Sequence, residues 1–359
     1  MSRVPEGPLR RGWTTGACAT AATAAAYTAL LTGRFPDPVT IRLPKGQTPS
    51  FPLAKSDLGE DEALAGVVKD AGDDPDVTHQ ALVQARVRPG APESGVTFAA
   101  GEGVGTVTRP GLQLAVGEPA INPVPRRMMI EAVQEIAEQH SAPPDLAIEV
   151  SIPGGAALAK KTLNGRLGIE GGLSVLGTTG IVIPYSCSSW IHSIHRGIDV
   201  ARAAGLAHLA AATGSASEAA VQKLYGLPEA ALLDMGDFVG GTLKYLREHP
   251  VERLTLAGGF GKLCKLAQGA MDLHSGRSRV DVAALAEHLE ALGADDTVIA
   301  KARQAETAAQ VLELAAGLPL AERIAEQARD VAAAQLDGSI TVEVIVFGRK
   351  GEILGHSPN

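Results

Sequence analysis

The segment LTLAGGFGK, residues 254–262, joins an apolar run to a glycine-rich turn and then to a segment with helical spacing. Leu254 to Ala257 is typical of a buried strand, and a helix is expected from Lys262 to Met271. The same order of strand, turn and helix is predicted at 207–225 and again at 230–248. Strands that alternate with helices at this spacing predict βαβ units around a parallel sheet.

The sequence on both sides of this pattern extends the predicted α/β domain. Ile181 to Ile183 is a short β-branched run that would begin it, and a helix is expected from about 188 to 204. Several helices are expected from Asp281 to Leu336, and Ile340 to Phe347 would close the sheet as its last strand.

The first half of the chain mixes strands with a few helices. An Ala-rich helix should begin at Thr14 or Thr15 and stop at Gly33, and a second helix should start at Pro125. Alternating apolar and polar residues predict strands at 146–152 and 39–43, and further strands are expected at 81–87 and 96–98. We therefore expect an α+β N-terminal domain at 1–176. It should be followed by an α/β domain at 177–359, with a mostly parallel sheet of the three-layer, Rossmann-like type.

Composition excludes several classes of protein. The 359 residues carry a net charge of −8, which argues against a general nucleic-acid binder. No apolar stretch reaches the roughly 18 residues that a membrane helix needs, and Met1 to Leu9 lacks the apolar core of a signal peptide. Cys18, Cys187 and Cys264 are too sparse for a disulfide framework or a structural zinc site. A cytoplasmic protein is expected.

Glycine-rich turns recur where predicted strands end. Such turns occur at Gly177–Gly180, at Thr213–Ser215, around Gly236 and at Gly258–Gly259. Ligands of open α/β sheets bind beyond the carboxyl ends of the strands, and glycine lets the backbone approach them closely. The alternative is that these glycines only make tight turns. No GxGxxG follows the first predicted strand of this domain and no GxxxxGK[ST] occurs, which disfavours a dinucleotide enzyme or a P-loop ATPase.

Charged residues offer candidates for proton transfer and for anion binding. Asp73 and Asp74 lie in a dense acidic segment at 70–76, which is equally compatible with a surface turn. His274 follows the helix that opens at the glycine turn and could contact a ligand or simply solvent. His192 and His195 share a helix face but lack a third ligand, so no metal site is predicted. Basic residues near turns could bind a polycarboxylate, although most would be ordinary surface charge.

Six strings run in order along the chain: RGWTTGACA at 11–19, DAGDDPDVT at 70–78, GEGVGTVTRPGL at 101–112, GEPAINPVPR at 117–126, LGTTGIV at 176–182 and GFGKL at 259–263. Together they are highly specific, and they resemble the motifs of one known family, the CbiD family of cobalt-precorrin-5B (C(1))-methyltransferases.

This resemblance implies methyl transfer from S-adenosylmethionine to ring carbon 1 of cobalt-precorrin-5B, giving cobalt-precorrin-6A in anaerobic-type cobalamin biosynthesis. The substrate would be a cobalt-bearing corrinoid rimmed by carboxylates. Candidate proton acceptors are Asp73, Asp74 and His274. The cofactor is expected against Gly177, Thr178, Thr179, Gly180, Thr213, Asp237, Gly258 and Gly259. The substrate is expected at Arg11, Thr14, Thr15, Arg109, Arg126 and Lys262.

Two other functions stay open at this point. A nucleotide-dependent small-molecule kinase could use the glycine-rich segment Gly101–Gly105, although no phosphate-binding lysine lies nearby. A non-catalytic corrinoid carrier is allowed by the loop at 213–218, which lacks an Asn associated with many family members. The sequence leaves the oligomeric state open, with a homo-oligomer among the options.

Overall fold

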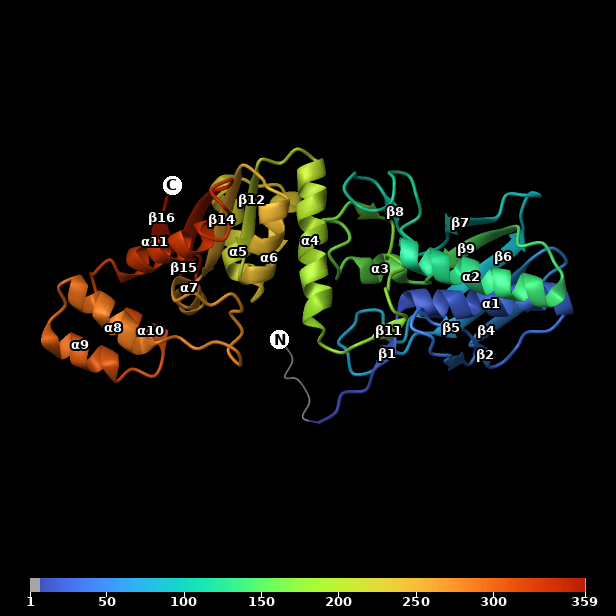
Figure 1. Ribbon diagram of the computed structural model, residues 1–359, viewed down its shortest axis with the longest axis horizontal. Coiled ribbons are helices and arrows are strands. Elements are labelled where there is room, and N and C mark those ends of the chain that lie inside the picture. Colours follow the sequence, from blue (N-terminus) through green and yellow to red (C-terminus); the bar gives the residue numbers. More distant parts are fainter. Residues whose placement is uncertain (1–6, 359) are drawn as a thin grey trace. The chain divides into compact units, whose positions relative to one another are not determined.

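The computed structural model describes residues 7–358, which divide after Ser186 into two compact units (Figure 1). Residues 1–6, most of the segment considered above as a signal peptide, lie outside the described residues. Within 7–358, no helix is both long enough and apolar enough to cross a membrane.

The first unit is built on a five-stranded sheet. In β6, every second residue, Val83, Ala85 and Val87, is a buried apolar side chain, whereas Arg86 and Arg88 on the opposite face are half-buried and exposed. All neighbouring strands are antiparallel except β7, which runs parallel to β9. The order across the sheet is β4 (Lys55–Leu58), β5 (Ala63–Val68), β6 (Leu82–Pro89), β9 (Leu146–Ser151) and β7 (Val96–Ala100).

Two long helices, α1 (Thr15–Thr32) and α2 (Pro123–His140), run side by side in this unit (Figure 1). Helix α1 is buried on all sides because it also packs against β5 and β6. Its alanines present only methyl groups, which lets a sheet and a second helix approach it closely. The helix is capped by the Thr14 side chain and ends at Gly33, whose φ is +74°, as the sequence predicts.

Short paired strands complete the first unit and correct the domain boundary. Strand β11 (Ile181–Val182), expected to open the α/β domain, pairs antiparallel with β1 (Gly12–Trp13). The boundary therefore follows Ser186 rather than residue 176, because residues 177–186 are held within the first unit. The expected strand at 39–43 is reduced to β2. The remaining elements are β2 (Val39–Thr40) with β3 (Ser50–Phe51), β8 (Thr106–Val107) with β10 (Ile169–Glu170), and α3 (Gly155–Ala159).

The second unit contains the mostly parallel sheet expected from the sequence. Its order is β13 (Leu232–Asp234), β12 (His208–Ala212), β14 (Arg253–Gly259), β15 (Thr341–Phe347) and β16 (Ile353–Ser357). The first four strands are mutually parallel, and β16 is antiparallel to β15. Strand β15 was expected to close the sheet, but the short turn after it allows β16 to fold back and form the edge.

Helices cover both faces of this sheet. Leu209 and Ala211 of β12 pack with buried residues of α4, α6, α7 and α11, whereas Ala210 and Ala212 pack with Val221 of α5 on the opposite face. Helices α8 to α10 extend the larger core. The helices are α4 (Cys187–Ala203), α5 (Ser215–Tyr225), α6 (Val239–Glu248), α7 (Phe260–Ala267), α8 (Val282–Ala291), α9 (Asp296–Arg303), α10 (Ala308–Leu314) and α11 (Leu320–Ala333), with a short 3₁₀ turn at Glu229–Ala231.

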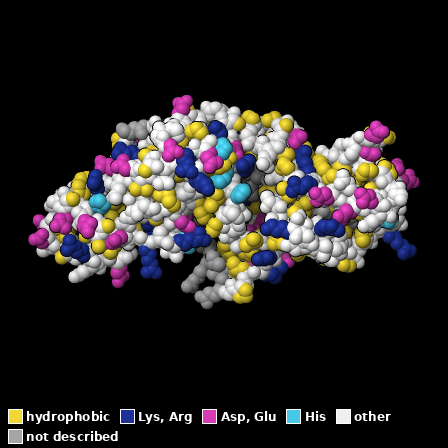
Figure 2. All heavy atoms as spheres, viewed as in Figure 1, with side chains coloured by type: hydrophobic (Ala, Val, Ile, Leu, Met, Phe, Trp, Pro, Cys, Tyr) yellow, Lys and Arg dark blue, Asp and Glu magenta, His cyan; other side chains and the backbone are white. Residues whose placement is uncertain are grey.

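The face drawn in Figure 2 carries charged side chains of both signs, with Lys and Arg interspersed among Asp and Glu. No large single-sign field covers that face. This mixed pattern agrees with the net charge of −8 and means that an anionic ligand would be recognised locally.

Candidate cofactor and substrate sites

The carboxyl ends of β12, β13 and β14 form one edge in the second unit. The amide of Thr213 donates to the carbonyl of Ala257 at 2.9 Å, and the amide of Gly236 donates to the carbonyl of Ala212 at 3.0 Å. The chain leaves β12 towards β13 on one side and returns to β14 on the other. The strand order therefore places a topological switch point between β12 and β14, which is where open α/β sheets bind ligands.

Helices α5 and α7 begin at this switch point, and glycine precedes each of them. Gly214 and Gly259 are the N-cap residues, so neither helix has a side-chain cap hydrogen bond. A Cβ added at either glycine would meet nothing within 4 Å. Gly258 differs, because its Cβ would lie 2.8 Å from Oγ1 of Thr213. Both helix N-termini thus offer backbone N–H groups with open space beside the N-cap residue.

A buried carboxylate lies at the same edge. Asp237 is 8% exposed, and its Oδ1 is 3.1 Å from Nζ of Lys262. This oxygen nevertheless accepts no hydrogen bond of good geometry, so the pair is an ion pair by distance only. Lys262 directs its better bond, at 2.7 Å, to the carbonyl of Thr213. The ammonium of Lys262 therefore contacts the loops after β12 and β13 from the start of α7, which follows β14. Oδ1 of Asp237 is left without a well-formed hydrogen bond.

The segment after α7 packs against this edge. The amide of Leu273 donates to the carbonyl of Asp237, and the exposed His274 accepts from the amide of Gly276 through Nδ1. Trp190 of α4 donates its indole N–H to the carbonyl of Asp234 at 3.0 Å, and its ring lies next to Gly236. Of the residues predicted from the sequence, the second unit thus brings Thr213, Asp237, Gly258, Gly259, Lys262 and His274 into one neighbourhood.

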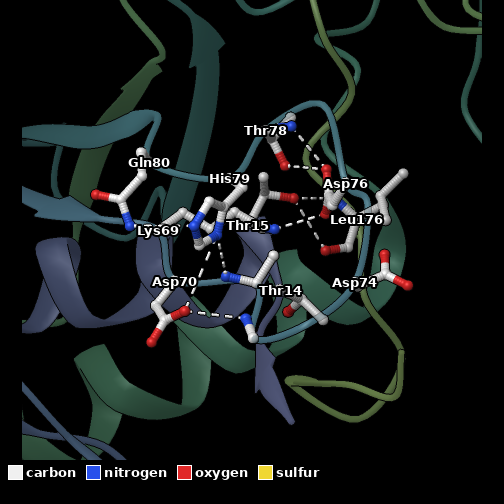
Figure 3. Close-up of polar contacts among 12 residues, drawn as sticks. Thr14, Thr15, Lys69, Asp70, Asp74, Asp76, Thr78, His79, Gln80 and Leu176 are labelled. Atoms are coloured by element: carbon white, nitrogen blue, oxygen red, sulfur yellow. Dashed lines mark hydrogen bonds and ion pairs between the residues drawn. The ribbon is translucent and has the colours of Figure 1, made fainter. Parts of the chain in front are cut away.

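The polar groups at the start of α1 form hydrogen bonds with other parts of the first unit. Thr14 caps the helix through Ala17, and the hydroxyl of Thr15 both donates to and accepts from the backbone of Leu176 (Figure 3). The amides of Trp13, Thr14 and Gly16 donate to the carbonyls of Asp70, Gly180 and Leu176. Thr14 and Thr15 are 6% and 3% exposed. Both threonines therefore hold the helix start in place.

The acidic segment surrounds this helix start, and each of its carboxylates has a structural partner. Asp70 accepts a hydrogen bond from Arg10, and this bond is the main reason why the pKa of Asp70 is lowered to about 2. Asp73 accepts from the backbone amide of Arg10 at 2.6 Å, and Asp74 accepts from that of Tyr185 at 2.8 Å. Figure 3 shows Asp70 and Asp74 on different sides of the loop, not directed towards one common point.

The fourth carboxylate, that of Asp76, forms an ion pair with the buried Lys69, which was not among the residues predicted from the sequence. Nζ of Lys69, which is 1% exposed, lies 2.6 Å from Oδ2 of Asp76, whose Oδ1 accepts from Thr78 (Figure 3). Burial raises the pKa of Asp76, but Lys69 and Thr78 outweigh it and leave the pKa lowered. The only feature of the sequence that could have indicated this pair is the position of Lys69 directly after the apolar strand ALAGVV.

Several motif glycines allow backbones to touch. A Cβ at Gly12 would lie 2.0 Å from the carbonyl carbon of Ala71, and one at Gly72 would lie 2.2 Å from the carbonyl oxygen of Arg10. The helix-start motif and the acidic motif are therefore interlocked. Gly177 and Gly180 have positive φ and face the side chains of Thr14 and Leu43. The segment Gly177–Gly180, with Thr178 and Thr179, thus belongs to the first unit and not to the strand-end loops of the second.

The glycine-rich segment considered for a kinase is also tightly packed. A Cβ at Gly103 would lie 2.0 Å from the carbonyl oxygen of Ile152, and one at Gly172 would lie 2.3 Å from that of Gly103. The turn accordingly contacts protein backbone on two sides. It has no phosphate-binding lysine in its own sequence, so packing accounts for its glycines.

The predicted substrate arginines differ in their availability. Arg126 donates to the carbonyls of Ile121 and Pro119 and pairs with Glu118 at 3.1 Å, so its guanidinium is occupied by the loop before α2. Arg11 and Arg109 are exposed. Among residues 7–358, no group of three or more His, Cys, Asp or Glu side chains could hold a metal ion.

The mostly parallel sheet, the two uncapped helix N-termini and the buried ion pair at the switch point define an α/β unit with a candidate site for a small ligand at its strand ends. Comparisons with known proteins identify the family. The CbiD family model matches residues 2–184 and the model of the CbiD C-terminal domain matches residues 272–358. The chain belongs to the CbiD family.

Similar proteins span nearly the whole chain. A protein of Paramagnetospirillum magneticum is 61% identical over 351 residues, covering 98% of each chain, and one of Brucella anthropi is 61% identical over 96% of this chain and 95% of its own. Both are named cobalt-precorrin-5B C(1)-methyltransferase. A crystal structure of the cobalamin biosynthesis protein CbiD from Archaeoglobus fulgidus is 26% identical. It covers 71% of this chain and 78% of its own, with a TM-score of 0.41.

Proposed function

We propose that this chain is an S-adenosylmethionine-dependent methyltransferase that methylates cobalt-precorrin-5B at ring carbon 1, giving cobalt-precorrin-6A in cobalamin biosynthesis. The names of relatives at 61% identity over nearly the whole chain support the reaction. The carrier and kinase alternatives are not favoured. The observation that carries the cofactor assignment is the under-used carboxylate of Asp237 beside two uncapped helix N-termini at the switch point.

The cofactor site of this proposal lies in the second unit, which we interpret as a three-layer, Rossmann-like domain. Thr213, Gly258 and Gly259 would line the cofactor, because their loops leave the sheet on either side of the switch point. When bound, S-adenosylmethionine supplies a methyl group already activated by its sulfonium. The protein therefore mainly has to align donor and acceptor, a contribution of roughly 7–11 kcal/mol at best.

The substrate side of the proposal rests on the first unit. The exposed guanidinium groups of Arg11 and Arg109 can meet substrate carboxylates, whereas Arg126, Thr14 and Thr15 are committed to the surrounding backbone. We propose that Thr14 and Thr15 fix the start of α1 and that Arg126 fixes the start of α2, so that these three residues support the substrate site rather than contact the substrate. Gly177–Gly180 would act in the same way, by bringing the backbone against Thr14.

The proton acceptor of the reaction is proposed among Asp73, Asp74 and His274. Asp73 and Asp74 each already accept one backbone hydrogen bond, from Arg10 and from Tyr185. His274 is exposed and uses only Nδ1 in its loop hydrogen bond with Gly276. Because an imidazole is the side chain most often used as a general base, we favour His274 of the three.

A cytoplasmic location belongs to the same proposal. The three cysteines are unpaired, as is usual in reducing compartments.

The test is calorimetric titration of the full chain with S-adenosylhomocysteine, together with mass-spectrometric detection of methylated product from a cobalt corrinoid substrate. Micromolar binding and a gain of one methyl group are expected. Absence of both, with substrate present, would exclude the proposed function. Binding of the corrinoid alone would instead support a carrier.

A further inference from the structure

The ion pair between Asp237 and Lys262 has the charge pattern expected of a site for the α-ammonium and α-carboxylate groups of an amino acid. Asp237 offers a buried carboxylate with an oxygen that accepts no well-formed hydrogen bond, and Lys262 offers an ammonium 3.1 Å away. An α-amino acid carries the complementary pair, an ammonium and a carboxylate on one carbon. A head-to-tail arrangement would satisfy all four charges.

The surroundings favour the same orientation of such a ligand. The uncapped N-termini of α5 and α7, eleven and eight residues long, provide N–H groups and a positive end for a carboxylate. Lys262 is 34% exposed at its side chain and remains anchored to the carbonyl of Thr213 at 2.7 Å. The Lys262 ammonium can therefore donate to a ligand carboxylate while it keeps its hydrogen bond to Thr213. Asp237, only 10% exposed at its side chain, needs a donor once Lys262 is shared.

We infer that Asp237 and Lys262 recognise the methionyl end of the cofactor, with Asp237 accepting from its α-ammonium and Lys262 donating to its α-carboxylate. This inference rests on the proposed function and refines it. Lys262, predicted from the sequence to bind substrate, is thereby assigned to the cofactor, and the pair acts as a specificity determinant for the amino acid portion rather than the nucleoside.

Three ligands separate this inference from the proposed function. S-Adenosylhomocysteine carries both charged groups, S-adenosyl-3-thiopropylamine keeps the amine without the carboxylate, and 5′-methylthioadenosine lacks both. Their affinities would be measured by calorimetry on the full chain with the variants Asp237→Asn and Lys262→Met. Lys265→Met is the matched control. Lys265 lies on the same helix and likewise donates to a backbone carbonyl, that of Leu273 at 2.7 Å, without a carboxylate partner.

We expect Asp237→Asn to weaken both amine-bearing ligands by about 10- to 100-fold, and Lys262→Met to weaken only S-adenosylhomocysteine by a similar factor. Methylthioadenosine should bind all variants equally, which also shows that the site is folded. Lys265→Met should change none of the ratios.

The other outcomes are equally distinct. Equal losses for all three ligands, or no loss for any, would overturn the inference while leaving the proposed function intact. A wild-type protein that binds none of the three ligands but still forms methylated product would overturn the inference alone, and absence of product as well would end both.

Discussion

Gly259 and Gly165 are two exposed glycines with similar freedom and different surroundings. A Cβ at either would meet nothing within 4 Å, and neither has a positive φ. Gly259 precedes α7 at the switch point, whereas Gly165 lies in a turn of the first unit. A larger side chain should therefore be tolerated by the fold at both positions.

We predict that Gly259→Val lowers affinity for S-adenosylhomocysteine at least about 10-fold by filling ligand space, with little change in stability. Gly165→Val should bind as the wild type does. Calorimetry and thermal unfolding of both variants check this. Equal binding by the two variants would remove Gly259 from the cofactor site. Gly177 and Gly180 cannot serve in such a test, because side chains there would collide with Thr14 and Leu43.

Lys69 shows how strongly a single residue can matter in a core made of small side chains. Its buried ammonium pairs with the half-buried Asp76 and stabilises the loop beside α1. We predict that Lys69→Met lowers the free energy of unfolding of the first unit by up to about 3 kcal/mol, because the half-buried Asp76 is left without its cation. Urea unfolding measures this. Lys55→Met, on the exposed strand β4, is the control and should change stability by less than about 0.5 kcal/mol.

At the scale of elements, Glu343 connects α5 to three strands of the second sheet. Its carboxylate accepts from Tyr225 at 2.6 Å, Thr255 at 2.7 Å and Arg253 at 2.9 Å, and lies 2.7 Å from Nε2 of His356. Burial raises the pKa of Glu343, but these partners outweigh it and lower it from 4.5 to about 2. Tyr225 responds oppositely, since burial and the neighbouring carboxylate raise its pKa to about 12.

A pH dependence of stability follows from Glu343. Its pKa is lower in the folded state, so its contribution is complete above about pH 4.5 and is lost as the pH falls towards 2. We predict that Glu343→Gln destabilises the second unit by about 3 kcal/mol at pH 7 and by only about 1 kcal/mol near pH 3. Urea unfolding at both pH values measures this. The exposed Glu287→Gln should behave like the wild type, and a pH-independent difference would contradict the assignment.

Most elements with a strong local signal could be predicted from the sequence. Helices α1 and α2 and strands β9, β12 and β14 lie within a few residues of their expected positions, because capping residues and apolar periodicity define them locally. Strand β11 was assigned to the wrong sheet, since its partner β1 lies about 170 residues earlier and pairing over that distance leaves no local pattern. Strand β16 was missed because its alternation is weak.

The candidate site was only partly predictable for a related reason. Glycines after strands indicated the edge formed by Thr213, Gly258 and Gly259, because parallel strands gather their carboxyl ends by geometry. Residue type alone could not separate an exposed arginine such as Arg11 from Arg126, whose guanidinium bonds to nearby carbonyls. The Lys69–Asp76 pair shows the same limit, since burial depends on the packed loop and not on the local sequence.

At the scale of the whole molecule, each unit has its own core and its own buried cysteine. Cys18 lies in the core of the first unit, where burial raises its pKa to about 12, and Cys264 lies in that of the second, where burial also raises its pKa. Cys187 is half-buried, with Arg277 against its sulfur at 3.4 Å. Only a thiol that reaches solvent as thiolate reacts readily.

We predict that the native protein reacts with a thiol reagent at Cys187 alone, and that Cys18 and Cys264 react as their own units unfold. Peptide mapping by mass spectrometry across a urea series measures each site separately. The variant Lys69→Met should move the labelling of Cys18 to lower urea, and Glu343→Gln should move that of Cys264. Simultaneous labelling of both sites in every variant would mean that the units unfold as one.

The scarcity of aromatic residues gives this protein a pair of built-in optical reporters. Of its two tryptophans, Trp13 packs edge-on against Phe51 next to the start of α1, with ring centroids 5.4 Å apart. Trp190, 42% exposed, lies beside Gly236 at the strand ends. Replacing Trp13 by Phe would leave tryptophan emission from the second unit alone. Binding at the proposed cofactor site could then be followed in real time without any attached dye.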